Sequence, residues 1–367
     1  MFLPKTASYQ TPSTRLGVKS LLISIAFLST LFSQPSFSYV YNCGNLESGT
    51  YDPQCVTNYN KNKSVTRPDF KNTVNIVRVL VNGKKSHPMG SIKNKTKKLI
   101  KFYRTISRNQ LNLEIGSVKT KTVRGGSCKS IMGRAKSGER SAFLTIFSLP
   151  IGICKASHGS KKRVFLNDNH FTSFAHESGH AIGLAHAARL KKNGKVEPYG
   201  DVSSSMGRAP AINYAISQLH WLGWTEKSDI VKINTDIEQG ETIEVTLRPV
   251  DKNIASENDT PVAYVYELPN ATRLFISIPK STRSGITDIK SGEIFVSKSR
   301  ICKGCTGISM NTRVLKRINS RDKATHDVSG LTITPISHKG SKINGVYRVS
   351  EVTLSISLSN STPEIDL

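Results

Sequence analysis

The segment FTSFAHESGHAIGLAHAA, residues 171–188, constrains the fold more than any other part of the chain. His176 and His180 are four residues apart, so their side chains project from one face if the segment is a helix. Gly183 lets the chain leave that helix, because glycine adopts the left-handed conformation of a helix end without strain. After such a turn, His186 returns toward the other two histidines. The spacing therefore predicts a helix, a turn and three imidazoles that face one point.

Three converging imidazoles are suitable ligands for one zinc ion. Glu177 follows the first histidine and is expected beside the open coordination position, where it takes a proton from the attacking water. Ordinary residue frequencies give HExxH by chance in roughly one chain of this length in a hundred, and HExxHxxGxxH in about one in a hundred thousand. The pattern therefore indicates a metal site rather than three unrelated surface or core histidines.

The first 38 residues are typical of a secretory signal peptide. Three basic residues precede the apolar run LLISIAFLSTLF, and the small residues Ser36 and Ser38 follow it. A membrane anchor is the alternative, but this run has 12 residues, whereas a bilayer span needs about 20. We therefore expect cleavage after Ser38 and a secreted or periplasmic protein without an integral membrane span.

All six cysteines follow the predicted cleavage site, an even number in an oxidising compartment where thiols pair. For CKGC, half of a zinc ribbon is the alternative, but the chain has no second CxxC. Proximity in the sequence predicts three disulfides: Cys43 with Cys55, Cys128 with Cys154, and Cys302 with Cys305.

The chain is strongly basic, with 52 Lys and Arg against 26 Asp and Glu and a formal net charge of +26. Such a surface attracts polyanions through long-range fields. The basic residues are spread out and lack the aromatic interleaving of a groove for single-stranded nucleic acid. The composition therefore favours loose attachment to acidic envelope glycans over specific recognition of nucleic acid.

The hydrophobic pattern divides the mature chain into three parts. Residues 39–72 are polar, contain two cysteines and are expected to form a disulfide-containing leader segment. Residues 73–225 combine the strand patterns TVNIVRVLVN, LNLEIGSVKT and RVFLND with helical spacing in KNKTKKLIKFYRTISRNQ, which predicts an α/β domain. Residues 226–367 alternate apolar and polar residues in six segments, which predicts an all-β module with the pattern of a sandwich.

The segment APAINYAISQLHWLGW joins the last two parts and predicts a helix that ends at Gly223. His220 lies outside the ligand spacing, and we expect no role for it in the metal site. Packing at the domain junction is expected for Trp221 and Trp224, with contact to substrate as the alternative. The predicted buried stripe contains Ile212, Ile216, Leu219 and Leu222.

These motifs resemble the metzincin metallopeptidases, and most closely the gametolysin family. HESGHAIGLAH is followed by YGDVSSSMG and then by QLHWLGW, and the resemblance covers about residues 73–250. It implies a metzincin-like catalytic domain, a twisted sheet with an active-site helix, over residues 73–225. It also implies a role for each matching residue: zinc ligands at His176, His180 and His186, the general base at Glu177, the turn at Gly183, and an apolar floor beneath the metal at Met206.

The sequence departs from relatives of this type in two places. Arg208 lies two residues after Met206, so an astacin-like tyrosine ligand is not available at that position. The leader contains no cysteine-switch motif, which leaves the means of latency open. A substrate strand is expected to pair antiparallel with an edge strand, for which RVFLND, residues 163–168, is the candidate.

Three functions are compatible with these features. The leading one is a secreted zinc endopeptidase that uses metal-activated water to hydrolyse peptide bonds of extracellular or envelope proteins. The alternatives are a basic surface-binding protein or adhesin with a vestigial metal site, and a structural zinc protein. The intact Glu177 and the three histidines disfavour both, because three ligands and a base suit an open catalytic site. We assign the C-terminal module to substrate placement or attachment, so a chain that ends near Ser228 is expected to retain cleavage of short peptides.

Overall fold

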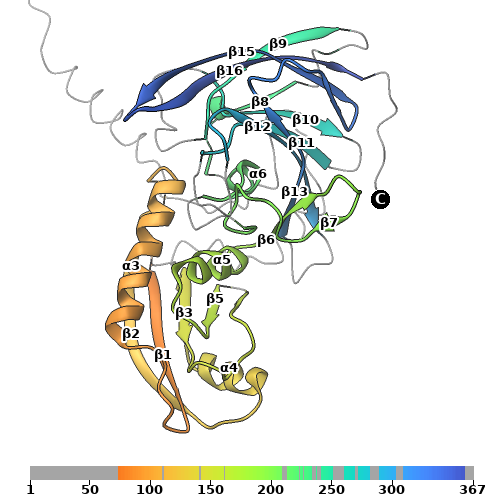
Figure 1. Ribbon diagram of the computed structural model, residues 1–367. Helices are drawn as coiled ribbons and strands as arrows, with labels where there is room; N and C mark the ends of the chain where they lie inside the picture. Colours follow the sequence, from red (N-terminus) through yellow and green to blue (C-terminus); the bar gives the residue numbers. More distant parts are fainter. Residues whose placement is uncertain are drawn as a thin grey trace, which may run out of the picture. The chain divides into compact units, whose positions relative to one another are not determined.

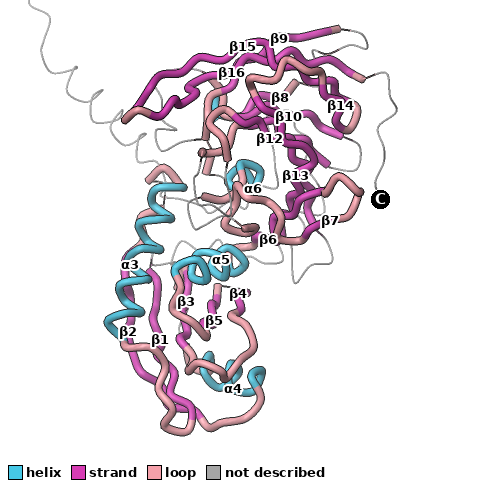
Figure 2. Tube along the Cα trace, in the orientation of Figure 1, coloured by secondary structure: helices cyan, strands magenta, loops and turns pink. Residues whose placement is uncertain are grey.

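Three β-sheets and the four helices α3, α4, α5 and α6 make up the described part of the computed structural model (Figures 1 and 2). The predicted signal peptide, the leader, and Cys43, Cys55 and Cys305 lie outside the described residues, as does the side chain of Cys302. The described ranges are 73–109, 111–139, 142–160, 162–208, 213–222, 224–225, 227–233, 237, 241–250, 260–268, 272–281, 289–302 and 309–359.

The first sheet has the order β2-β1-β3-β5-β4, with every neighbouring pair parallel except β4 and β5. Strand β1, which lies between β2 and β3, has the sequence TVNIVRVLV, a nearly continuous apolar run that is buried on both faces, as parallel strands usually are. The strands of this sheet are β1 (Thr73–Val81), β2 (Glu114–Val123), β3 (Leu144–Ser148), β4 (His158–Ser160) and β5 (Arg163–Leu166).

The strand order of the first sheet corrects the prediction that RVFLND forms its edge strand. Strand β5, which contains the sequence RVFL, lies between β3 and β4, so both of its edges are already paired. The edge strand on this side of the sheet is β4, and β2 is the other edge. Strand β4 pairs antiparallel with β5 from His158 opposite Phe165 to Ser160 opposite Arg163. A strand of three residues gives no alternating pattern to read in the sequence.

Helices cover both faces of the first sheet (Figure 1). On one face, α3 (Met89–Ile106) and α5 (Phe171–Ala181) share a core with Val74 and Ile76 of β1. On the other face, α4 (Cys128–Lys136) packs against the alternate residues of the sheet. The disulfide Cys128–Cys154 ties the first residue of α4 to the loop that follows β3, which confirms that predicted pair.

The C-terminal half is built of strands, which confirms a β-rich module. The second sheet, sheet B, has the order β7-β6-β13-β12-β11-β10-β8, and the third, sheet C, has the order β14-β15-β16-β9. Inward residues of both sheets share one hydrophobic cluster. The bounds are β6 (Leu184–Leu190), β7 (Val196–Glu197), β8 (Ile230–Lys232), β9 (Thr242–Leu247), β10 (Ala263–Leu268), β11 (Thr272–Ser277), β12 (Glu293–Cys302), β13 (Ser309–Asn319), β14 (His326–Val328), β15 (Leu331–Ile343) and β16 (Val346–Leu358).

Sheet B crosses the predicted boundary between residues 225 and 226. Strand β6 pairs parallel with β13, with Ala187 opposite Thr312 and Arg189 opposite Val314. One core also spans the boundary, since Phe275 of β11 belongs to the same cluster as the helix residues of the first half. The division into separate domains stays a prediction, and the two halves share both a sheet and a core.

The segment between the halves differs in part from its predicted form. Helix α6 (Ile216–Trp221) begins later than the predicted helix, because residues 213–215 are not helical. Residues 209–212 and Gly223 lie outside the described ranges. Trp221 and Trp224 are 1% and 3% exposed, which confirms packing. The 3-10 helix η2 (Lys227–Asp229) follows.

Strand β2 also begins later than predicted, since Leu111 and Leu113 are buried but precede it.

No helix within the described ranges combines the length and the apolar character needed to cross a membrane.

Candidate metal centre

Helix α5 carries the first two histidines of the site. Its buried residues, Phe174, Ala175, Ser178, Gly179 and Ala181, face the core, whereas His176 and His180 lie on the half-exposed side. The helix follows from this amphipathic spacing, because the buried positions recur at intervals of three and four residues.

Gly183 ends the helical segment as predicted. The helix stops at Ala181, and Gly183 has a φ of +98°, a conformation that side chains other than glycine rarely adopt. The chain then continues as β6, on which His186 lies. The ligand atoms of His176, His180 and His186 all lie within 4.8 Å of one another. The structure therefore brings together the three predicted histidines.

Backbone carbonyls fix the orientation of two of these rings. The Nδ1 atom of His176 lies 2.9 Å from the carbonyl oxygen of Ser205, and that of His180 lies 2.7 Å from the carbonyl oxygen of Leu184. A carbonyl can only accept, so Nδ1 donates and Nε2 is left with a free lone pair. Metal-binding histidines are usually oriented in this way.

The Nε2 atoms meet at the centre of the group. Those of His180 and His186 are 3.0 Å apart, and the ring of His176 lies near both. Burial lowers the pKa of all three imidazoles, to about 4 for His180 and His186. The rings are therefore neutral at pH 7, which is the form that binds metal. The three histidines could hold a metal ion.

Glu177 lies on α5 where the helix packs against the edge strand β4. Burial raises the pKa of its carboxyl group to about 7, and a hydrogen bond from the backbone N–H of Gly159 partly opposes this rise. The contact between the two elements is close, because a Cβ atom added to Gly159 would overlap the backbone oxygen of Glu177. Glycine at position 159 thus allows β4 to lie directly on the helix.

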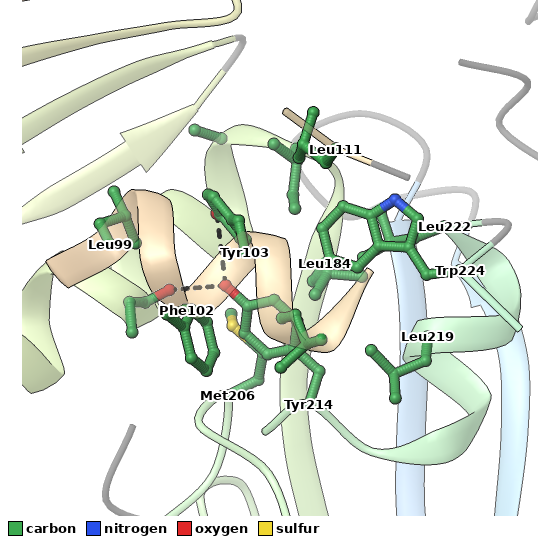
Figure 3. Packing of buried hydrophobic residues seen from close by; sticks show 14 of the residues in the cluster. Leu99, Phe102, Tyr103, Leu111, Leu184, Met206, Tyr214, Leu219, Leu222 and Trp224 are labelled. Atoms are coloured by element: carbon green, nitrogen blue, oxygen red, sulfur yellow. Dashed lines mark hydrogen bonds between the residues drawn. The ribbon is translucent and has the colours of Figure 1, made fainter. Parts of the chain in front are cut away.

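Met206 forms a buried support under α5. It is 0% exposed, and its sulfur approaches Gly179, which lies between the two histidines on the helix. Its carbonyl oxygen accepts from the backbone N–H of Ala187, the residue after His186. Figure 3 shows Met206 next to Tyr214, whose hydroxyl donates to the carbonyl of Ala175. Met206 therefore packs against the buried side of α5, and its role as an apolar floor beneath a metal stays a prediction.

The turn around Met206 is held by side chains of its own segment. The hydroxyl of Ser204 donates to Gln218 of α6 at 2.7 Å, and the hydroxyl of Ser205 donates to the carbonyl of Asn213 at 2.8 Å. Because the carbonyl of Ser205 also orients His176, this turn connects the floor of the site to a metal ligand. Arg208 is directed into an ion pair with Glu197.

Tyr199 belongs to the site but was not singled out from the sequence. The centroid of its ring lies 4.0 Å from that of His186 and 6.0 Å from that of His176. The side chain is 47% exposed. The motif YGDVSSSMG contains this residue, but nothing in its spacing indicates that the ring packs on a histidine.

The other histidines near this region are not part of the group. His220 is buried on α6, where its Nδ1 atom lies 3.1 Å from the hydroxyl of Thr225 and its ring faces Phe275. His170 is the N-cap of α5. Neither lies among the three that can share one ion.

Comparisons with known proteins add no relative to this description. A scan of the chain against protein-family models and a search among curated proteins both gave no match.

Proposed function

We propose that this chain is an exported zinc endopeptidase of the metzincin type, with a catalytic site that resembles that of the gametolysin family. The observation that carries the proposal is the convergence of three neutral imidazoles, two with Nδ1 bound to a backbone carbonyl, beside Glu177. Three histidine ligands leave one position open, which distinguishes catalytic zinc sites from closed structural ones with four ligands.

The donor set is compatible with zinc and disfavours magnesium and calcium. Imidazole nitrogen is a ligand for zinc, copper, iron and nickel, whereas magnesium and calcium prefer oxygen. His176, His180 and His186 would hold the ion through Nε2, and Met206 would support α5 beneath it. When bound, zinc would supply Lewis-acid polarisation of the scissile carbonyl and a lower pKa for the attacking water.

Glu177 would transfer the protons of the reaction. Its carboxylate takes a proton from the attacking water and passes that proton to the leaving amine when the peptide bond breaks. A carboxyl pKa of about 7 keeps both protonation states within reach near neutral pH. A dication held by the histidines would lower this pKa, because an opposite charge favours the carboxylate.

Strand β4 is the element that would receive the substrate. It is the edge of the first sheet, it lies on α5, and its Gly159 hydrogen-bonds with Glu177. An extended peptide that adds to this edge would place its backbone next to the three histidines. We infer that the substrates are proteins or peptides outside the cytoplasm, because the N-terminal segment has the pattern of a signal peptide.

A peptide library tests this function. The purified mature protein, loaded with one equivalent of zinc, is incubated with peptides derived from a whole proteome, with and without chelator. We expect cleavage that stops with chelator and returns with zinc, and a near-unit zinc content that is lost in the variant with His176, His180 and His186 all replaced by Ala. Unchanged zinc content in that variant would refute the metal site. The absence of cleavage by the zinc-loaded protein would refute the peptidase.

A further inference from the structure

His186 is held differently from the other two histidines. His176 and His180 each bind a backbone carbonyl through Nδ1. Within the described part of the chain, the hydrogen bond found for His186 is the one between its Nε2 and that of His180, the atoms that face the metal position. A histidine ligand without an outer hydrogen bond needs another contact to fix its ring.

Tyr199 supplies a contact of this kind. Its ring packs on His186 with 4.0 Å between the centroids and an angle of 46° between the planes. The same ring lies 6.0 Å from His176. It therefore borders two of the three histidines from the solvent side, in keeping with its exposure of 47%.

The backbone around Tyr199 is fixed to β6, the strand that carries His186. The N–H of Gly200 donates to the carbonyl of Glu197 at 2.9 Å, and the N–H of Asp201 donates to the carbonyl of Ala187 at 3.2 Å. Gly200 also lies close against β6, because a Cβ atom added there would be 2.7 Å from the Cβ of Arg189.

One ion pair closes this hairpin, and a second ties it to the segment after Met206. Glu197 of β7 contacts Arg189 of β6 at 2.7 Å and Arg208, just beyond Met206, at 3.0 Å. These contacts join the hairpin that precedes Tyr199 to the segment that supports α5. The position of the tyrosine is therefore set by the same structure that sets the third histidine.

We propose that Tyr199 is a positioning residue of the metal centre, whose ring holds the imidazole of His186 in the orientation that binds the ion. This inference rests on the proposed metal site. Partners that orient metal-bound histidines typically change metal affinity by about 10- to 100-fold when they are removed. The ring, rather than the hydroxyl, makes the contact, so phenylalanine should replace tyrosine at this position.

Zinc affinity measured by chelator competition tests the inference without reference to hydrolysis. We expect Tyr199→Ala to bind zinc about 10- to 100-fold more weakly than the wild type, and Tyr199→Phe to restore wild-type affinity. Val196→Ala is the matched control, because Val196 lies in the same hairpin and is 41% exposed. It should leave zinc affinity unchanged. The visible absorption of the cobalt(II)-substituted protein should change in Tyr199→Ala and remain the same in Tyr199→Phe, because it reports the geometry around the ion.

Two results would overturn the role of the ring. One is wild-type affinity and an unchanged cobalt spectrum in Tyr199→Ala, and the other is equal weakening in Tyr199→Phe, which would assign the effect to the hydroxyl. Circular dichroism and thermal unfolding of the metal-free forms check the fold, and Tyr199→Leu takes the place of the alanine variant if the latter does not fold. A wild-type protein that binds no zinc would refute the metal site itself, whereas a wild type that binds zinc together with an unaffected Tyr199→Ala refutes only this inference.

Discussion

Gly179 of α5 and Met206 are in such close contact that a Cβ atom added to the glycine would overlap the methionine sulfur. Gly179 lies immediately before His180, and Met206 is fully buried. The absence of a side chain at position 179 therefore allows the helix with two of the three histidines to rest on its support.

Replacing Gly179 with Ala should destabilise the protein. The buried methionine and the nearby hydroxyl of Tyr214 would have to shift, and overpacking of this kind costs about 1–3 kcal/mol. Urea unfolding in the presence of chelator measures the change without a contribution from metal. Gly133→Ala in α4 is the control, since an added Cβ there meets nothing within 4 Å and should stabilise the helix by about 0.5–1 kcal/mol. Equal stability of the two variants would show that the contact with Met206 is not tight.

Asp229 should be essential for the stability of the described fold. Its carboxylate is 1% exposed and pairs with Arg108, which follows α3, and with Arg248 at 3.0 Å, which follows β9. In Asp229→Asn, two largely buried guanidinium groups lose the ion pair with this carboxylate, and breaking a buried ion pair typically costs about 3–5 kcal/mol. Chemical unfolding measures this loss. Glu351→Gln removes a pair with Lys339, whose side chain is 80% exposed, and should cost no more than about 1 kcal/mol. A loss of no more than about 1 kcal/mol in Asp229→Asn would mean that these buried ion pairs contribute little to the free energy of unfolding.

His220 should make the stability of the protein depend on pH. Burial lowers the pKa of this side chain from 6.5 to about 4, so the unfolded chain binds a proton there more readily than the folded one does. The contribution of neutral His220 to the free energy of unfolding is complete above pH 6.5. It is lost as the pH falls toward 4, and the free energy of unfolding decreases by roughly 3 kcal/mol over this range. Unfolding of wild type and His220→Gln with chelator, at several values between pH 7 and 4, should show the smaller pH dependence in the variant. Identical slopes of the free energy of unfolding against pH in the two proteins would contradict the lowered pKa of His220.

A chain that ends at Ser228 should fail to bind zinc. Strand β6, which carries His186, has its parallel partner in β13, and the core around Phe174 continues into Phe275 of β11. Deletion of residues 229–367 removes both. The sequence alone led us to expect peptide cleavage by the shortened chain, and the pairing of β6 with β13 reverses that expectation. Zinc content and near-ultraviolet circular dichroism measure the outcome. A folded fragment that binds one zinc ion would establish an independent N-terminal domain.

The sequence predicted the local parts of the site because their geometry is local. His176 and His180 are one helical turn apart, and a turn at Gly183 depends on that residue alone. These features need no knowledge of distant contacts. The short segments of alternating residues after Trp224 likewise predicted most of the strands of the C-terminal half.

The remaining features depend on contacts that the sequence does not encode locally. The pairing of Ala187 with Thr312 joins segments far apart in the chain, and basic residues interrupt the alternation in β13. Strand β4 has only three residues and no alternating pattern, so the sequence predicts RVFL as the edge strand instead. Tyr199 reaches His186 because a hairpin and two ion pairs hold its loop, and none of these has a pattern of its own.

The most direct measurement compares zinc content and peptide hydrolysis in wild type and Glu177→Gln. Glutamine keeps the shape of the side chain but cannot accept the proton, whereas His176, His180 and His186 remain unchanged. We predict one zinc ion per molecule in both proteins and turnover lower by about 10²- to 10⁴-fold in the variant. Turnover close to that of the wild type in zinc-loaded Glu177→Gln would contradict the proposed base and, with it, the proposed function of this site.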